Sequence, residues 1–150
     1  MHTLRVHSLD AVAGSRLAIV TLQTQALEVA QRLSDTQIGL VVVCDADGAM
    51  VGVISKTDIV RQMGHCLGSA CHTLAADLMT TAVITCQRTD ILHSVLAVMQ
   101  AHDLVHMPVL DAHHRPVGVV NARDALRSLV AADEYEQALL IDYVMGVGYH

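Results

Sequence analysis

The chain has 150 residues, of which 53% are hydrophobic, and it carries a formal net charge of -6. This length suits one compact domain or two small halves with a shared core. The negative charge argues against a surface that collects nucleic-acid phosphates, and no apolar run approaches the roughly 18 residues that span a membrane. Charged residues interrupt the N-terminal region where a secretory signal needs an apolar stretch. We therefore expect a cytoplasmic protein that binds neither nucleic acid nor membrane.

The first half of the chain predicts the order strand, helix, strand, hairpin turn, strand, helix. Its strands are the apolar runs 17–21 and 40–44 and the run that contains Gly52, and the polar sequence DADG separates the last two. The last strand runs directly into the final helix. Between the first two strands, a helix with one buried face is predicted by apolar residues at helical spacing: Ala26, Leu27, Ala30 and Leu33.

The second half repeats this order, after a polar linker at 65–74. Its strands are the runs 82–85 and 106–110 and the run that contains Gly118, with the turn sequence DAHHR between the last two. The buried face of its first helix is predicted to consist of Leu92, Val95, Leu96 and Met99. Residues 132–150 continue as a helical tail, and we expect a second copy of the chain to cover its apolar residues: Ala138, Leu139, Ile141, Tyr143 and Val144.

The two halves are related by an internal repeat at a constant offset. The sequence DADGAMVGVISKTDIVRQM begins at Asp45 and aligns with DAHHRPVGVVNARDALRSL, which begins at Asp111, 66 positions later. Each copy has too little core to fold alone, so we expect the two to pack as a pseudo-symmetric pair. We predict an α/β (α+β) fold in which repeat 1 (8–64) and repeat 2 (75–131) each form a small three-stranded sheet with two helices.

The sequence Ser-x-x-Asp at Ser55–Asp58 has two interpretations, and they apply equally to Asn121–Asp124. The first is helix capping, because Ser and Asn are good N-caps and an acid in the first helical turn is stabilising. The second is ligand binding. A capping box normally carries Glu or Gln at its third position. We expect the shorter Asp side chain not to reach the N–H of the cap residue, which favours the second interpretation.

Both copies resemble the end of a repeat in tandem CBS domains, which reads Gly, two apolar residues, Thr or Ser, two variable residues, Asp and an apolar residue. GVISKTDI, from Gly52, matches this pattern throughout, whereas GVVNARDA, from Gly118, has Asn121 at the hydroxyl position. The sequences LMTTAVIT (78–85) and HMPVLD (106–111) are also similar to that family. The resemblance covers nearly the whole chain and identifies it as a stand-alone pair of CBS domains.

The resemblance implies a regulatory module, not an enzyme, that binds AMP, ADP, ATP, NAD or S-adenosylmethionine in two clefts between the repeats. It also implies a disc-like homodimer and a signal passed to an unknown partner by a change of conformation or assembly. Cleft one would combine Thr21, Ile38, Gly39, Leu40, Asn121, Arg123 and Asp124. Cleft two would combine Thr85, Val105, His106, Met107, Ser55, Lys56 and Asp58, with Val53 and Pro108 as further contacts.

These residue types suit a nucleotide. A carboxylate can accept hydrogen bonds from both ribose hydroxyls, and Asp58 and Asp124 would each do so from the first turn of a helix. The unpaired N–H groups of that turn can hold phosphate oxygens, beside Lys56 or Arg123. Because the chain has no Phe or Trp, adenine would lie between aliphatic side chains, namely Ile38, Val53, Val105 and Val119. Asn121 departs from the family pattern, so the cleft with Asp58 is the first place to look for ligand.

Two functions of other classes stay open. The first is a constitutive dimerisation scaffold, with empty clefts and with Asp58 and Asp124 acting only as helix caps. The second is a response to metal or redox state through the sequence HCLGSACH, although its spacing matches no standard zinc pattern; the candidate ligands are His65, Cys66, Cys71 and His72. The sequence contains neither the motif GxSxG nor HExxH nor a Gly-rich phosphate-binding loop, so catalysis has no support from motifs.

Overall fold

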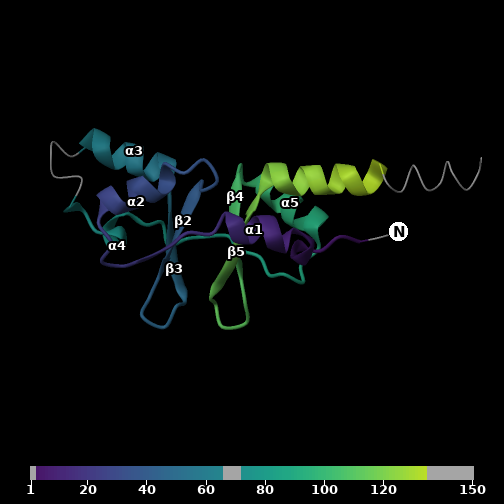
Figure 1. The fold of residues 1–150 in the computed structure, drawn as a ribbon, viewed down its shortest axis with the longest axis horizontal. Helices are drawn as coiled ribbons and strands as arrows, with labels where there is room; N and C mark the ends of the chain where they lie inside the picture. The colour runs from purple at the N-terminus through teal and green to yellow at the C-terminus, as the bar shows by residue number, and fades with distance from the viewer. Residues whose placement is uncertain (1–2, 66–71, 135–150) are drawn as a thin grey trace, which may run out of the picture.

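Two β-hairpins lie side by side at the centre of the structure (Figure 1). The computed structural model describes residues 3–65 and 72–134. Repeat 1 supplies the hairpin of β2 (Leu40–Cys44) and β3 (Met50–Ser55), and repeat 2 supplies that of β4 (His106–Leu110) and β5 (Pro116–Asn121). A hydrogen bond of 2.9 Å from the Met50 N–H to the His114 carbonyl joins the hairpins near their turns. The predicted mixed α+β fold is confirmed.

Repeat 1 forms a three-stranded sheet in the order β1-β2-β3, in which β1 (Ile19–Thr21) is parallel to β2. One face of this sheet packs against α2 (Ala26–Leu33), and α3 (Lys56–His65) follows β3 directly. The helix α2 buries Ala26, Val29 and Leu33, whereas Leu27 is 52% exposed. The predicted buried stripe is therefore wrong at Leu27, because consecutive residues lie about 100° apart around a helix.

Repeat 2 has a two-stranded sheet, β4-β5, where the sequence predicts three strands. Residues 82–85 form no strand, and the pairing with β4 is an isolated parallel bridge from Cys86 to Val109. The cause lies upstream, where Thr80 pairs with Val53 of β3 through backbone hydrogen bonds of 3.0 and 2.8 Å. The chain therefore stays with the sheet of repeat 1 as far as Thr80 and reaches the edge of β4 at Cys86.

Two helices cover the sheet of repeat 2, namely α5 (Leu92–Ala101) and a helix over residues 122–134. The helix α5 buries the four residues predicted for it, which confirms that stripe: Leu92, Val95, Leu96 and Met99. The apolar residues of the predicted tail and most of the linker lie outside the described residues. Among the residues that are described, no helix is both long enough and apolar enough to cross a membrane.

Each core is completed by a segment from the other half of the chain. Near the N-terminus, η1 (Val6–Leu9) and α1 (Asp10–Ser15) bury Val6, Leu9 and Ala13 in the core of repeat 2. Figure 1 accordingly shows α1 beside β5, although the two elements are far apart in the sequence. In return, α4 (Ala75–Leu78) buries Ala75 in the core of repeat 1.

A further apolar cluster fills the space between the two hairpins. Repeat 1 contributes Leu40, Val42, Cys44, Met50 and Val53, and repeat 2 contributes Leu110 and Val119. Because successive side chains of a strand point to opposite faces, β2 packs one set of residues against the helices and the other against repeat 2. The two repeats therefore share one apolar interface.

Gly118 allows α1 to approach β5 closely, because a Cβ atom at this position would lie 2.9 Å from the Cβ of Ala13 and 3.1 Å from its carbonyl carbon. We predict that Gly118→Ala lowers the free energy of unfolding by about 1–3 kcal/mol, since backbone atoms of α1 must shift. Urea denaturation measures this change. The matched control is Gly14→Ala, where a Cβ has no atom within 4 Å, and it should be neutral or stabilising by up to about 1 kcal/mol. A Gly118→Ala protein as stable as the parent would contradict the close packing.

Candidate ligand-binding site

A cavity of about 780 Å³, here called the central cavity, lies where both hairpins run into helices. β3 ends at Ser55 and continues into α3, and β5 ends at Asn121 and continues into the helix over 122–134. Ser55 pairs with Leu40, the first residue of β2, and Asn121 pairs with His106, the first residue of β4. The central cavity therefore lies at the hairpin ends opposite the turns, and the first turns of two pseudo-symmetric helices face it.

The central cavity brings together members of both predicted clefts. Its wall includes Gly39, Leu40, Asn121 and Arg123, which were predicted for cleft one, and Val105, His106, Ser55 and Lys56, which were predicted for cleft two. It also includes residues that the sequence analysis did not single out, namely Arg16, Thr36, Thr57, Asp103, Leu104 and Ala122. Residues of both predicted clefts therefore line one cavity, with one half at the start of each helix. Asp58 and Asp124 do not line it themselves but directly follow the lining residues Thr57 and Arg123.

Thr21 lies far from the residues with which the prediction grouped it. The strand register pairs Thr21 with Cys44, four residues beyond Leu40 along β2, which corresponds to about 13 Å. The grouping of Thr21 with the start of β2 is therefore wrong. The offset of 66 positions relates Thr85 to Ile19, so Thr21 and Thr85 are not equivalent positions of the two repeats.

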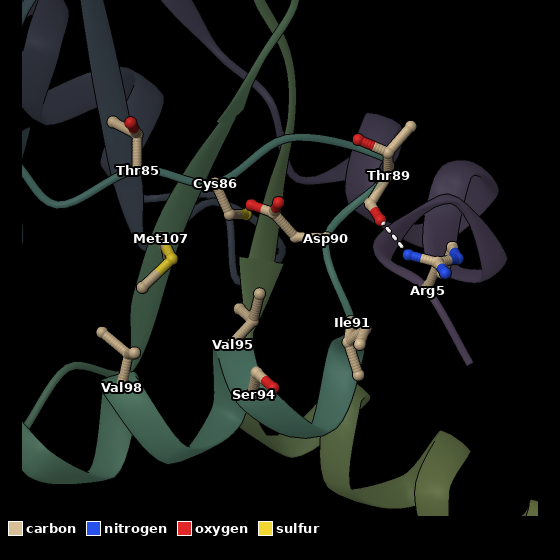
Figure 2. Close-up of a pocket in the computed structure, with 10 residues that line it drawn as sticks. All are labelled: Arg5, Thr85, Cys86, Thr89, Asp90, Ile91, Ser94, Val95, Val98 and Met107. Carbon is tan, nitrogen blue, oxygen red and sulfur yellow. Dashed lines mark hydrogen bonds between the residues drawn. The ribbon is translucent and has the colours of Figure 1, made fainter. Parts of the chain in front are cut away.

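Thr85 and Met107 line a second cavity, of about 420 Å³, which Figure 2 shows beside α5. Met107 follows His106 in β4, and successive side chains of a strand point to opposite faces. Met107 therefore packs toward Val95 and Val98 of α5, whereas His106 lines the central cavity. The structure thus separates Thr85 and Met107 from the other residues predicted for cleft two.

Three further predicted contacts are buried in the protein interior. Ile38 packs in the core of repeat 1, and Val53 packs between the hairpins. Pro108 is buried in β4, where its carbonyl accepts a hydrogen bond of 3.1 Å from the Cys86 N–H. The apolar wall of the central cavity comes from other residues, namely Leu40, Leu104 and Val105.

Asp58 forms a reciprocal capping box with Ser55. The Asp58 Oδ2 atom accepts a hydrogen bond of 2.9 Å from the Ser55 N–H, and the Asp58 N–H donates to Ser55 Oγ at 3.2 Å. The expectation that Asp is too short to reach back is therefore wrong. The other carboxylate oxygen, Oδ1, lies 3.7 Å from Nη1 of Arg61 and accepts no hydrogen bond from the described residues. This oxygen can accept a further donor.

Asn121 caps the helix over 122–134 and fixes the protonation state of His106. Its side-chain oxygen accepts hydrogen bonds from the N–H groups of Arg123, at 2.8 Å, and Asp124, at 3.3 Å. The amide nitrogen Nδ2 therefore faces Nε2 of His106, 3.2 Å away, and must donate to it, because an amide NH₂ group has no acceptor. His106 is thus neutral in this arrangement, with its proton on Nδ1.

The His106 ring packs directly against Gly39 of repeat 1, so that a side chain at position 39 would displace the ring. His106 therefore forms a contact between the repeats at the centre of the cavity. Burial lowers the pKa of His106, and the positive charges of Arg16 and Lys56 act in the same direction, against the opposing charge of Asp124.

Asp124 is bound by Arg16, which the sequence analysis did not select. Arg16 donates from Nη2 to Asp124 Oδ1 at 3.0 Å and from Nε to Oδ2, and the hydrogen bond raises the pKa of Arg16. Both carboxylate oxygens are therefore engaged, and the ribose contact predicted for Asp124 requires Arg16 to move. The sequence shows only that the repeats differ here, because the offset of 66 relates Arg16 to the uncharged Ala82.

Lys56 and Arg123 place two exposed positive charges at the central cavity. Within residues 3–65 and 72–134, neither side chain has an ion-pair partner. Both lie at the start of a helix, where the helix dipole favours an anion, although the N–H groups of Arg123 and Asp124 are already bound by Asn121. The combination suits a phosphate group.

The metal and redox alternative finds no support in the part of the chain that the structure describes. No group of three or more His, Cys, Asp or Glu side chains there could hold a metal ion. Cys66 and Cys71 lie outside the described residues. Cys44 and Cys86 are buried free thiols, and burial raises the pKa of Cys86 to about 12, which makes it a poor nucleophile.

A protein-family model described as CBS domain matches residues 10–65 and 75–131. Each match includes a hairpin and the start of the helix that follows it, and thus the residues that meet at the central cavity. The chain belongs to the CBS domain family. Its two matches make it a CBS pair, in agreement with the resemblance found in the sequence.

Solved structures of CBS-domain proteins share this fold. The CBS-domain containing protein ATU1752 from Agrobacterium tumefaciens is 25% identical, with a TM-score of 0.72 over 83% of this chain and 98% of that chain. The CBS domain pair of protein MJ0100, in complex with 5′-methylthioadenosine and S-adenosyl-L-methionine, is 21% identical, with a TM-score of 0.73 over 87% of this chain and 99% of that chain. CBSX2 in complex with AMP is 18% identical, with a TM-score of 0.70 over 83% and 97%.

Curated relatives include longer proteins. A homoserine O-acetyltransferase of Methanosphaera stadtmanae is 29% identical over 96 residues, which are 64% of this chain and 18% of the relative. The arabinose 5-phosphate isomerase GutQ of Salmonella typhi is 28% identical over 111 residues, which are 74% of this chain and 34% of the relative. The chain therefore spans only a minor part of these two enzymes.

The lowered pKa of His106 predicts a pH dependence of stability. The unfolded chain takes up a proton at this residue near its ordinary pKa of 6.5, before the folded chain does. The stabilisation is therefore fully present above about pH 6.5 and is lost as the pH falls toward the lower folded pKa. We predict that His106→Gln reduces the drop in melting temperature between about pH 7.5 and about pH 5.5.

The matched control for this measurement is His93→Gln, because His93 is exposed on α5. It should show the same drop in melting temperature as the parent. An equal drop in the parent and in His106→Gln would contradict the assignment of a neutral, half-buried imidazole at the contact between the repeats.

Proposed function

We propose that this CBS pair is a regulatory module that binds an adenine nucleotide, such as AMP, ADP, ATP or NAD, in the central cavity. The observation that carries the proposal is the convergence of two helix first turns on one cavity of about 780 Å³. This volume lies in the range of small-molecule sites, about 300–1,000 Å³. The chemistry of the wall provides a place for each part of a nucleotide.

The phosphate groups would lie beside Lys56 and Arg123. Both cations line the central cavity, and both lie in the first turn of a helix, where the helix dipole favours an anion. Neutral His106 adds a hydrogen-bond donor at Nδ1. A ligand with phosphate therefore gains contacts that a nucleoside without phosphate does not.

The ribose would lie at Asp58, which directly follows the lining residue Thr57 and whose Oδ1 atom has no hydrogen-bond donor among the described residues. Adenine would lie against the aliphatic wall of Leu40, Leu104 and Val105, of which Val105 is 58% exposed and can lose that exposure on binding. The chain has no Phe or Trp, so adenine has to pack on aliphatic groups. The adenosine ligands of the MJ0100 pair and of CBSX2 support this choice of ligand class.

The signal would pass through a homodimer. Exposed apolar residues lie on the helices of both repeats, and Val60 of α3 and Leu126 of the helix over 122–134 are equivalent at the offset of 66. Figure 1 shows these helices on the side of the molecule opposite the hairpin turns. A second copy of the chain, with the same pseudo-symmetric face, would cover both positions at once. A nucleotide that prefers one arrangement of the repeats would then shift the arrangement of the dimer.

Isothermal titration with AMP, ATP and adenosine tests the nucleotide proposal. Lys56→Ala and Arg123→Ala should each weaken AMP and ATP binding by about tenfold and leave adenosine nearly unchanged, because they remove a charge-assisted contact to phosphate. The matched control is Arg115→Ala, an exposed cation at the turn of the β4-β5 hairpin, which should bind like the parent. No binding of any adenine compound by the parent would favour the scaffold with an empty cavity.

Sedimentation of a Val60→Asp/Leu126→Asp variant tests the dimer proposal. A buried, unpaired carboxylate at each position of the interface should convert the dimer to a monomer. The control is Val117→Asp, at a residue of β5 that is 38% exposed and lies on the hairpin. A parent chain that is already monomeric would contradict a signal through the dimer.

A further inference from the structure

The two repeats differ at the carboxylate that follows each cap residue. Asp124 is 6% exposed, and both of its oxygens accept hydrogen bonds from the guanidinium of Arg16. Arg16 also donates from Nη1 to the carbonyl of Gln37, at 3.2 Å, so the guanidinium is bound on more than one side. Asp124 therefore has a dedicated cation inside the protein.

Asp58 has no equivalent partner. The residue related to Arg16 by the offset of 66 is Ala82, which is exposed and uncharged. Among the described residues, Asp58 forms an ion pair only with Arg61, at 3.7 Å, and the side chain of Arg61 is 66% exposed. This distance exceeds that of an ordinary hydrogen bond, and an exposed ion pair of this kind is weak. Asp58 therefore keeps an acceptor that Asp124 lacks.

Arg16 is held in place by the packing of α1 rather than by Asp124 alone. It directly follows α1, in which Ala13 lies against Gly118, and α1 begins at Asp10, which pairs with Arg88 of repeat 2. Because the backbone next to Arg16 is fixed in this way, little conformational freedom is lost when the guanidinium binds Asp124. The ion pair is part of the segment exchange between the repeats.

A ribose cannot readily take the place of this guanidinium. Its two neutral hydroxyls would have to replace two charge-assisted hydrogen bonds, and Arg16 would be left without its carboxylate in a partly buried position. At Asp58, the same hydroxyls would displace no internal hydrogen bond at Oδ1. The two halves of the central cavity are therefore chemically unequal.

We propose that Arg16 closes the Asp124 half of the central cavity, so that the CBS pair takes one adenine nucleotide per chain, at Asp58. This inference rests on the proposed nucleotide-binding function. It makes Arg16 a specificity-determining residue of the central cavity that sets the number of ligands. The asymmetry originates in a single charged position that only one repeat carries.

Isothermal titration of the full chain with AMP, repeated with ATP, tests the inference through two independent variants. The parent should bind one nucleotide per chain. Asp58→Asn should weaken this binding by about tenfold or more, whereas Asp124→Asn should keep the affinity of the parent, because Asp124 is already occupied by Arg16. Both variants keep the side-chain volume, and Asp124→Asn can still accept one of the two hydrogen bonds from Arg16.

The variant Arg16→Gln should bind two nucleotides per chain, and the double variant Arg16→Gln/Asp124→Asn should return to one. Two nucleotides on the parent chain, or equal losses in Asp58→Asn and Asp124→Asn, would overturn the inference while leaving nucleotide binding intact. The absence of binding by the parent to either nucleotide would instead overturn the proposed function, and the inference with it. Should Arg16→Gln fail to fold, the comparison of the two Asp→Asn variants still decides.

Discussion

Ala13 of α1 lies against Gly118 of β5 so closely that no side chain fits between them, and Met79 and Thr80 lie against Gly52 of β3 in the same manner. These two contacts lock each repeat to a segment from the other half of the chain. Neither sheet has enough apolar cover from its own half, so the exchange completes both cores. It also holds the two hairpins side by side, which brings two helix starts to one cavity.

The exchange has an electrostatic consequence as well. The segment that packs on Gly118 ends at Arg16, and this places the guanidinium on Asp124. The segment that packs on Gly52 has Ala82 at the equivalent position. A nearly symmetric backbone thus carries an asymmetric charge. The same asymmetry explains why capping and ligand binding are not exclusive at Asp58, since one of its oxygens caps α3 and the other faces no donor in the described residues.

Much of the fold could be predicted because the offset of 66 repeats a whole unit, and the helical stripe of α5 follows directly from its apolar spacing. The missing strand at 82–85 could not be predicted, because it depends on the pairing of Thr80 with a strand far away in sequence. Half of the predicted site residues line the central cavity, Asp58 and Asp124 directly follow lining residues, and the others lie elsewhere for identifiable reasons. Thr21 fails through register, Met107 through the alternation of side chains along β4, and Ile38 through burial in a core.

Arg16 illustrates the remaining limit. The family pattern directs attention to positions that both repeats share. Arg16, which distinguishes the two repeats, is not part of that pattern. Its contact with Asp124 joins residues 108 positions apart and arises from the packing of α1 on repeat 2. Periodicity and motif spacing report local structure, so a contact of this kind becomes visible only when the fold is known.

The central claim is that a nucleotide binds between the repeats at the starts of α3 and of the helix over 122–134. An amide-resolved NMR titration of the full chain with AMP tests it most directly. Saturable shifts are expected at residues 55–58, 105–106 and 121–123, with the hairpin turns unchanged. Shifts confined to the second cavity, around Thr85 and α5, or no shifts at saturating AMP, would contradict it.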